Sequence, residues 1–296
     1  MYKEQRYFFI GSEWLYYKLY MGSRISDMFL TQILTPITNQ LIQHKIIDKW
    51  FFINYKDPDR HVRIRLRIID IKNLNHVINI LHKAIEPFIN NKTINKVLID
   101  TYKRELERYG FETIKESETI FFSNSKLITY IISHSKDDNE RWLWGLKSID
   151  TFLNAWDLNI KLKKDLFENL KNVFGQEMGV TTNINRQLSK KYRSNRDKVN
   201  EIMNKKYNIH FDAILQKYLA ENQKIVIKIL EKRKETKSRL LLSEVLESYI
   251  HMHCNRLFKS NHRLNEWVLY YFLHQYYRSK EAQSNTISPK KIMLQE

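Results

Sequence analysis

Strict alternation of polar and apolar residues marks the segment His61–Ile68, in which every second side chain is Val, Ile or Leu. A period of two residues is typical of a β-strand whose two faces differ. The preceding segment, Trp50–Pro58, is an apolar and aromatic run that ends in a turn. The two segments therefore predict a pair of neighbouring strands.

Apolar residues have helical spacing in much of the remaining chain. This spacing occurs between about residues 73 and 90, and 96–102 then resembles another strand. From about residue 123 onward no strand-like alternation interrupts the helical pattern. The predicted fold class is α+β, with a mainly antiparallel sheet plus helices in the N-terminal half and largely long helices in the C-terminal half. The long helical stretches lie near 141–155, 160–174, 210–233, 238–258 and 263–281.

No linker divides the chain into separate domains. Its 296 residues include only six glycines and four prolines, which form no low-complexity segment. With 43% hydrophobic residues, the chain can bury a core, so we expect a single domain over residues 1–283. Residues 284–296 lose the apolar periodicity and contain Pro289, and a flexible tail is expected there.

Several kinds of chemistry are excluded by missing motifs. The single cysteine, Cys254, cannot form an internal disulfide, and no Cys/His group has the spacing of a zinc site. There is no P-loop, dinucleotide-binding glycine fingerprint or nucleophile elbow. We therefore expect neither a metal nor another cofactor. The single cysteine fits a reducing cytoplasm, and the apolar stretch before Gly11 is too short for a signal peptide or a membrane span.

The formal net charge of +17 predicts a surface that attracts nucleic acid, acidic lipid or an acidic substrate. Abundant Lys, Ile and Asn are also typical of a genome of low GC content, which raises the lysine count without any link to binding. The aromatic residues lie at helical spacing among Leu and Ile, without a recognisable nucleic-acid-binding motif. No direct nucleic-acid binding is expected.

The alternating strand would carry a row of polar side chains on one face. Like charges at this spacing repel each other unless solvent, protein carboxylates or an anionic ligand cover them. Guanidinium groups suit a carboxylate ligand because they donate two parallel hydrogen bonds. A solvated outer face is the alternative that composition alone favours. The row consists of His61, Arg63, Arg65 and Arg67.

Glu105 and Arg108 form a second candidate group. They are three residues apart in a segment that predicts a helical turn ending at Gly110, where their side chains would be neighbours. An ordinary surface ion pair followed by a glycine cap is the alternative that the local pattern favours.

His251 is the third candidate, within a long apolar helix. It lies four residues after Glu247 and four before Asn255, so the three side chains share a face, and a carboxylate or amide there could fix the imidazole tautomer. His253 projects from a different face, and the two histidines lack the spacing of a helical metal pair. A hydrogen-bonded core histidine is an equal alternative.

Four motifs follow one another along the chain: Trp14-Leu-Tyr-Tyr-Lys-Leu-Tyr20, Trp50–Pro58 running into His61-Val-Arg-Ile-Arg65, Tyr102–Gly110 and His251-Met-His-Cys-Asn-Arg256. Together they resemble one known family, the C-terminal domain of lantibiotic dehydratases, which is also found alone in thiopeptide-type bacteriocin pathways. The resemblance spans roughly residues 5–275. Two positions depart from the family pattern: Asn54, where relatives often have Arg, and Phe111, where they have a second Gly. The fit of a peptide is expected to differ there.

The resemblance implies a reaction divided between two proteins. A separately encoded protein would use glutamyl-tRNA to esterify Ser or Thr of a ribosomally made precursor peptide. The present chain would then remove glutamate by β-elimination and leave dehydroalanine or dehydrobutyrine. The implied partners are the precursor peptide, leader and core together, and the tRNA-dependent glutamylating protein, with a homodimer as an open option. The implied location is cytoplasmic, with peripheral attachment to a membrane-associated biosynthetic complex left open.

The resemblance also implies roles for particular residues. Elimination needs a base for the α-proton, stabilisation of enolate-like charge and a site for the glutamate carboxylates. The cationic residues would bind glutamate and stabilise charge, His251 would transfer a proton as base or as acid, and Glu105 would orient Arg108 or share the proton transfer. The implied catalytic residues are His251, Arg63, Arg65, Glu105 and Arg108, and the implied substrate-binding residues are Arg63, Arg65, Arg108 and Lys18.

Three other functions remain open. Some members of the same family are pyridine synthases, which join two dehydroamino acids and expel the leader peptide, and these tend to lose the elimination residues. A non-catalytic subunit that holds the precursor peptide against a basic face is the second alternative. A nucleic-acid binder is the third, supported by net charge alone.

Overall fold

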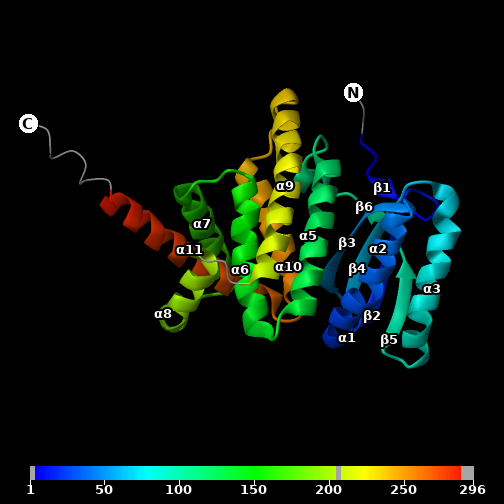
Figure 1. Ribbon diagram of the computed structural model, residues 1–296, viewed down its shortest axis with the longest axis horizontal. Coiled ribbons are helices and arrows are strands. Elements are labelled where there is room, and N and C mark those ends of the chain that lie inside the picture. Colours follow the sequence, from blue (N-terminus) through cyan, green and yellow to red (C-terminus); the bar gives the residue numbers. More distant parts are fainter. Residues whose placement is uncertain (1–3, 205–207, 288–296) are drawn as a thin grey trace, which may run out of the picture. The chain divides into compact units, whose positions relative to one another are not determined.

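The computed structural model describes residues 4–204 and 208–287. The chain is organised as two compact units, each built from two separate segments (Figure 1). Unit 1 comprises the residues up to Asp137 together with Ala220–Ser260, and unit 2 comprises Asp138–Leu219 together with the residues from Asn261. The single domain expected over residues 1–283 stays a prediction.

Unit 1 contains a four-stranded antiparallel sheet with the order β3-β4-β2-β5. Strands β3 and β4 confirm the predicted strand pair, and Arg65 of β4 lies opposite Phe51 of β3 and Tyr16 of β2. A two-stranded sheet pairs β1 with β6. The α+β fold class is thereby confirmed. The bounds are β1 Tyr7–Phe8, β2 Trp14–Met21, β3 Ile47–Lys56, β4 Arg60–Ile68, β5 Ile94–Ile99 and β6 Tyr102–Lys103.

The helices of unit 1 lie alongside this sheet (Figure 1). Helix α3 confirms the helix predicted near 73–90, and its apolar stripe of Val77, Leu81 and Ile85 is buried. Helix α5 begins earlier than the helical pattern predicts. The bounds are α1 Ser23–Met28, a π-helical turn Phe29–Leu34, α2 Thr35–Gln43, a 3-10 turn Ile71–Asn73, α3 Leu74–Asn90, α4 Leu106–Tyr109, α5 Ile114–His134 and α10 Leu242–Leu257.

Side chains of α10 close the outer edge of β3. Asn54 N donates to Asn255 Oδ1 at 2.8 Å, and Asn255 Nδ2 donates to Asn54 O at 2.9 Å. Next along the strand, Arg256 Nε donates to Phe52 O at 2.7 Å. The backbone groups of an edge strand need partners when they are buried. These bonds therefore fix α10 against the sheet, although the two segments are far apart in the sequence.

In its described residues, unit 2 contains helices joined by short turns, without a strand. Helices α6, α7 and α11 confirm predicted helices, as do α9 and α10. Helix α8 was not predicted because most of its side chains are polar, and it buries a single stripe that includes Leu188, Tyr192 and Val199. Helix α11 extends to Ile287, and the remainder of the predicted tail, 288–296, lies outside the described residues. The bounds are α6 Asp138–Ala155, α7 Ile160–Glu177, α8 Thr182–Asn204, α9 Ile209–Glu235, which continues into unit 1, and α11 His262–Ile287.

A buried cation lies inside unit 2. Lys163 is 5% exposed, and its Nζ donates to Asp150 Oδ1 at 2.7 Å and also to Asn154 Oδ1. Tyr277 OH donates to the same Asp150 oxygen at 2.6 Å. The charge of Lys163 is thus balanced by a carboxylate, and that carboxylate is itself hydrogen-bonded, as a buried ion pair requires.

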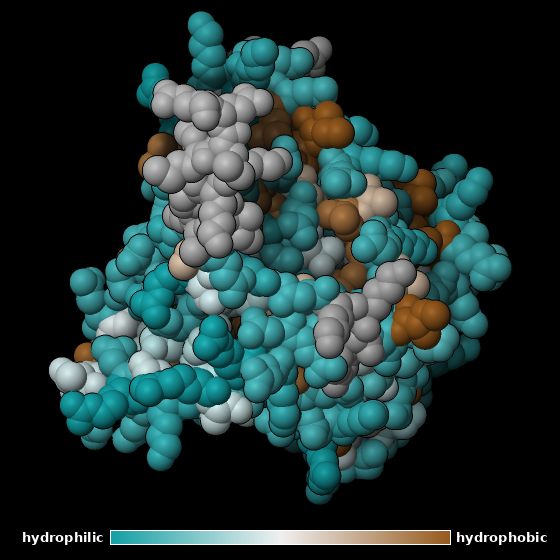
Figure 2. All heavy atoms as spheres, turned by 60° about the vertical axis from the view of Figure 1, so that its left-hand side comes forward, coloured by the Kyte–Doolittle hydropathy of each residue, from teal (hydrophilic) through white to brown (hydrophobic). Residues whose placement is uncertain are grey.

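Hydrophilic side chains cover most of the face shown in Figure 2, and the hydrophobic residues on it form separated patches. This agrees with a sequence in which 50 Lys and Arg residues accompany 33 Asp and Glu residues. Across residues 4–204 and 208–287, no helix combines the length and the apolar character that crossing a membrane requires.

Candidate functional site

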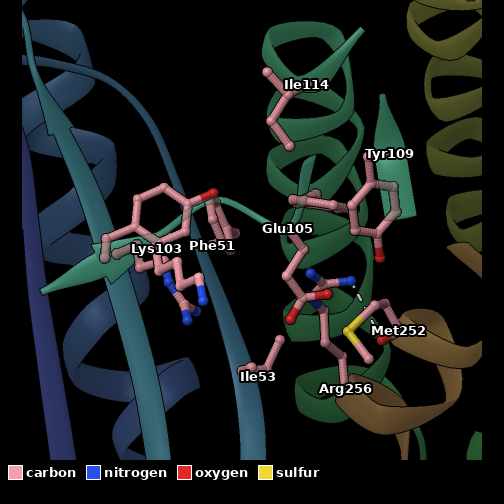
Figure 3. A pocket seen from close by; sticks show the side chains of 11 residues that line it. Phe51, Ile53, Lys103, Glu105, Tyr109, Ile114, Met252 and Arg256 are labelled. Carbon is pink, nitrogen blue, oxygen red and sulfur yellow. Dashed lines mark hydrogen bonds between the residues drawn. The ribbon is translucent and has the colours of Figure 1, made fainter. Parts of the chain in front are cut away.

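An open pocket of about 390 Å³ lies in unit 1, between one face of the sheet, the segment from β6 to α4, and helices α5 and α10 (Figure 3). Cationic side chains outnumber carboxylates on its wall, since Arg65, Lys103 and Arg256 accompany Glu105. This combination suits a ligand with an anionic group and an apolar part. The other lining residues are apolar or aromatic: Phe51, Ile53, Tyr102, Tyr109, Ile114, Phe121 and Met252.

Arg65 is a buried cation, 8% exposed, on the inner strand β4. Its guanidinium carbon lies 4.4 Å from the ring centre of Tyr16, 4.9 Å from that of Tyr102 and 5.3 Å from that of Phe51. The ring faces partly offset the loss of water around the charge. Its Nε is buried without a hydrogen-bond partner, and Arg65 forms no ion pair with any carboxylate of the described residues. Because a buried charge without a counter-charge is unfavourable, this position suits an anionic ligand.

A buried ion pair holds the segment from β6 to α4 beside the pocket. Arg104 and Glu118 are 2% and 1% exposed, and their two hydrogen bonds measure 2.6 Å and 2.7 Å. Tyr102 OH donates to the same carboxylate at 3.0 Å. Burial raises the pKa of Tyr102, so its phenol stays protonated and remains a donor. A bidentate pair fixes orientation as well as distance, and here it holds the Tyr102 ring next to Arg65.

Glu105 immediately precedes α4, and its side chain extends into the pocket (Figure 3). Its carboxylate pairs with Arg108 Nε at 3.4 Å, and the two side chains are 60% and 46% exposed. The helical turn ends at Gly110, whose φ of 77° favours glycine, as predicted. The exposure of both side chains agrees with the alternative of an ordinary surface ion pair. That alternative does not explain why Glu105 lies on the pocket wall.

Arg256 belongs to a buried polar network behind the pocket and was not predicted as a site residue. Its Nη1 donates to Asn124 Oδ1 at 3.1 Å, and Asn124 Nδ2 lies 2.7 Å from His253 Nδ1. Because the Asn124 oxygen faces the guanidinium, its NH₂ group donates to His253, whose Nδ1 must be unprotonated. Burial lowers the pKa of His253 to about 3, which agrees with a neutral ring. The network therefore orients the Arg256 guanidinium at the pocket.

A second cationic group lies further along the same sheet face. Arg63 Nε donates to His61 Nε2 at 3.0 Å, and the guanidinium carbon of Arg63 lies 3.4 Å from the ring centre of Tyr55. Lys18 lies opposite Arg63 across the β2–β4 pair and forms an ion pair with Asp100. The hydrogen bond from Lys18 lowers the pKa of the Asp100 carboxyl. Neither Arg63 nor Lys18 lines the pocket.

His251 lies on α10 directly before Met252, which lines the pocket, but is not itself part of the pocket wall. It is half-buried. One turn later on the same face, the Asn255 amide binds the backbone of Asn54. Asn54 therefore contacts α10 and is not among the residues that line the pocket.

The structure brings some of the predicted site residues together at the pocket and places others outside it. Arg65 and Glu105 lie on the pocket wall, and Arg108 forms an ion pair with Glu105. The alternative of a solvated strand face is wrong for Arg65 and for His61, which is 1% exposed. The rings around Arg65 were missed because they come from β2, β3 and β6, which meet only in the fold. Arg256 had one sequence signal, its place in the His251–Arg256 motif. In the part of the chain that the structure describes, no group of three or more His, Cys, Asp or Glu could hold a metal ion.

The fold and the pocket define an α+β protein whose open pocket is lined by more cations than carboxylates. Residues 14–277 match the family described as "Lantibiotic biosynthesis dehydratase C-term", and the chain belongs to this family. It is similar to the nisin biosynthesis protein NisB of Lactococcus lactis subsp. lactis, with 27% identity over 274 residues that cover 91% of this chain and 26% of NisB. It is also similar to the subtilin biosynthesis protein SpaB of Bacillus subtilis, with 23% identity, 92% of this chain and 26% of SpaB. The chain thus spans about a quarter of the length of these relatives.

Two solved structures share the fold. The tRNA-dependent lantibiotic dehydratase MibB from Microbispora sp. 107891 superposes with a TM-score of 0.67 and 19% identity, over 93% of this chain and 29% of MibB. TbtD, a pyridine synthase from thiomuracin biosynthesis, superposes with a TM-score of 0.66 and 8% identity, over 92% of this chain and 100% of TbtD. At these identities the likeness concerns the fold alone.

Proposed function

We propose that this protein removes glutamate by β-elimination from glutamylated Ser or Thr residues of a precursor peptide. The observation that carries the proposal is Arg65, a buried cation on a pocket wall whose Nε has no partner. A carboxylate of the glutamyl group is an anion that this position suits. Membership of the lantibiotic dehydratase C-terminal family supports the same reaction.

The reaction assigns one task to each part of the site. A base removes the α-proton of the esterified residue, the electron pair forms the Cα=Cβ bond, and the Cβ–O bond breaks to release glutamate. Arg65 binds a carboxylate of the glutamyl group, and the neighbouring Arg63 and Lys18 extend the cationic surface for developing negative charge. Glu105, held by Arg108, faces the same pocket.

The decisive experiment is mass spectrometry of a chemically glutamylated Ser/Thr peptide incubated with the purified protein. We expect wild type to release glutamic acid and leave a dehydrated peptide, and Arg65→Met to lower the rate by about 100-fold or more, the usual effect of removing a charge-stabilising donor. Arg67→Gln is the matched control, because Arg67 lies on the same strand and is paired with Asp48 at the surface. An Arg65→Met protein as active as wild type would contradict the assignment of Arg65.

The proton-transfer group is tested in the same assay. His251 is our candidate from the family pattern, whereas Glu105 lies on the pocket wall. Glu105→Gln and His251→Gln each remove a titrating group at nearly constant size. Loss of elimination in His251→Gln, with Arg65 intact, supports His251 as acid or base. Loss confined to Glu105→Gln assigns proton transfer to Glu105.

Elimination needs a peptide whose Ser or Thr is already glutamylated. We propose that a separately encoded, tRNA-dependent protein supplies this glutamylation, and the fold shared with the tRNA-dependent lantibiotic dehydratase MibB supports the dependence on tRNA. A reconstitution tests this: dehydration of an unmodified precursor peptide should require that protein, glutamyl-tRNA and the present chain together. Dehydration by this chain alone would overturn the division of labour.

A pyridine-forming activity is the second candidate, supported by the fold that the chain shares with the pyridine synthase TbtD. The test is a leader-bearing peptide that already contains two dehydroalanines. Release of the leader with formation of a six-membered nitrogen ring would establish this activity. An unchanged mass, with elimination observed on the glutamylated peptide, would exclude it in favour of elimination.

A further inference from the structure

The hydrogen bonds of His61 determine its tautomer. Its Nδ1 lies 2.8 Å from the carbonyl oxygen of Asp59, which can only accept, so Nδ1 carries the hydrogen. Its Nε2 lies 3.0 Å from Arg63 Nε, which can only donate, so Nε2 carries a lone pair. The ring is therefore neutral, and both of its nitrogens are used. A second proton on Nε2 would face the N–H of Arg63 and break the bond between them.

Rings on the neighbouring strands fix the position of His61, which is 1% exposed. Tyr20 of β2 stacks on the imidazole with ring centres 4.6 Å apart, and Tyr55 of β3 lies at 5.4 Å. The Tyr55 ring also lies under the Arg63 guanidinium, 3.4 Å from its central carbon. Arg63 is thus held at Nε by His61 and on one flat side by Tyr55. Its two terminal nitrogens make no hydrogen bond with the described residues.

We infer that His61 is a positioning residue for Arg63. The neutral imidazole of His61 accepts from Nε of Arg63 and leaves the two terminal guanidinium nitrogens for a ligand carboxylate. The nature of the ligand rests on the proposed function. The coupling between the two side chains does not, because it follows from the hydrogen bonds alone. Protonation of His61 releases Arg63 and places two cations side by side, so the orientation of Arg63 is lost at acidic pH.

Burial and the neighbouring cations both favour the neutral form of His61. Burial is the main cause of a lowered pKa of His61, and the cations Arg63 and Lys18 lower it further. The hydrogen bond to Asp59 and the carboxylate of Asp57 act in the opposite direction. On the strands beside the ring, Tyr20 and Tyr55 face His61. Lys96 of β5 lies 5.5 Å from the ring centre of Tyr20. Arg63 therefore stays oriented at neutral pH and is released only below the ordinary titration range of histidine, about pH 6.5.

The coupling can be tested without any substrate. Nitrogen-15 spectra of the histidine rings, with the His61 signal assigned by its loss in His61→Gln, report both the tautomer and the titration midpoint. We expect the Nδ1–H tautomer and a midpoint below the ordinary histidine value of about 6.5, and we expect Arg63→Met to raise the His61 midpoint. The opposite tautomer, or a midpoint unchanged by Arg63→Met, would overturn the inference.

The second arm measures elimination on the glutamylated peptide as a function of pH. His61→Phe keeps a ring but removes the acceptor, so kcat/KM should fall roughly tenfold or more at neutral pH, where His61 of the wild type is unprotonated. His61→Gln keeps an acceptor that does not titrate, so it should be much more active than His61→Phe. Its kcat/KM should also lack the part of the decrease at low pH that protonation of His61 causes in wild type. His44→Gln is the control, and thermal unfolding of each variant checks folding. Equal activity of His61→Phe and wild type would contradict the role of His61, whereas an inactive wild type with the expected spectra would contradict only the proposed function.

Discussion

Two buried cations, Lys163 in unit 2 and Arg65 in unit 1, have very different surroundings. Lys163 donates to the Asp150 carboxylate at 2.7 Å and lies 5.5 Å from the ring centre of Tyr277. Arg65 is nearly as buried, but aromatic rings surround it and its Nε lacks a partner. Within the described residues no carboxylate pairs with it. One cation is neutralised by the protein itself, and the other faces an open pocket.

Arg104 shows that this difference is not a property of the two units. It lies in unit 1, close to the pocket, and is paired twice with the buried Glu118. Lys163 and Arg104 thus each have a carboxylate partner on another element of the fold. Arg65, on the pocket wall, is instead surrounded by aromatic rings, which lower the cost of burial without occupying the guanidinium edge. The contrast supports a binding role for Arg65.

The largest expected difference between Lys163 and Arg65 is in the free energy of unfolding after each is replaced. We expect Lys163→Met to lower the free energy of unfolding by about 3 kcal/mol, because the Asp150 charge would lose its cation in a mostly buried site. Arg65→Met should leave the free energy unchanged or raise it, since no carboxylate loses a partner. Urea unfolding at neutral pH measures both changes.

Lys161→Met is the matched control for this experiment, because Lys161 is exposed on the same helix, α7. It should change the unfolding free energy by no more than about 0.5 kcal/mol. A loss of stability in Arg65→Met as large as that in Lys163→Met would break the comparison, because Arg65 would then be a structural cation like Arg104.

A smaller effect concerns the neutral histidines His253 in unit 1 and His274 in unit 2. Burial lowers their pKa values to about 3 and about 4. Their unfolded pKa is near 6.5, so the unfolded state binds protons that the folded state excludes. Their contribution to stability is complete above about pH 6.5 and is lost as the pH falls toward the folded values.

The measurement is urea unfolding at pH 7.5 and pH 4.5 for wild type and His253→Asn, whose amide oxygen can still accept from Asn124. We expect the variant to lose about 2 kcal/mol less than wild type between the two pH values. Protonated carboxylates affect both proteins alike and cancel in the difference. An identical loss in the two proteins would mean that His253 is not buried in its neutral form.

Local patterns in the sequence predicted the strands β3 and β4 and most of the long helices, because alternation and helical spacing report which side chains are buried. Helix α8 was missed since its buried stripe is sparse. The site was predicted only in part. Arg65 and Glu105 could be named from their motifs, but the cage of Tyr16, Phe51 and Tyr102 depends on strand order, which local pattern does not contain. Because strand order was unknown, the sequence alone favoured a solvated face for the strand that carries Arg65.

The smallest effect on stability is expected at the exposed pair of Glu105 and Arg108. Arg108→Gln should change the unfolding free energy by less than about 0.5 kcal/mol, because both charges are well hydrated. Elimination should nevertheless fall at least roughly tenfold if Arg108 holds Glu105 toward the pocket, since a carboxylate that swings away no longer acts there. Arg6→Gln is the control, because Arg6 pairs with the exposed Glu107 and is not among the residues that line this pocket. If Arg108→Gln and Arg6→Gln were equally active, the Glu105–Arg108 pair would be an ordinary surface ion pair with no role in elimination.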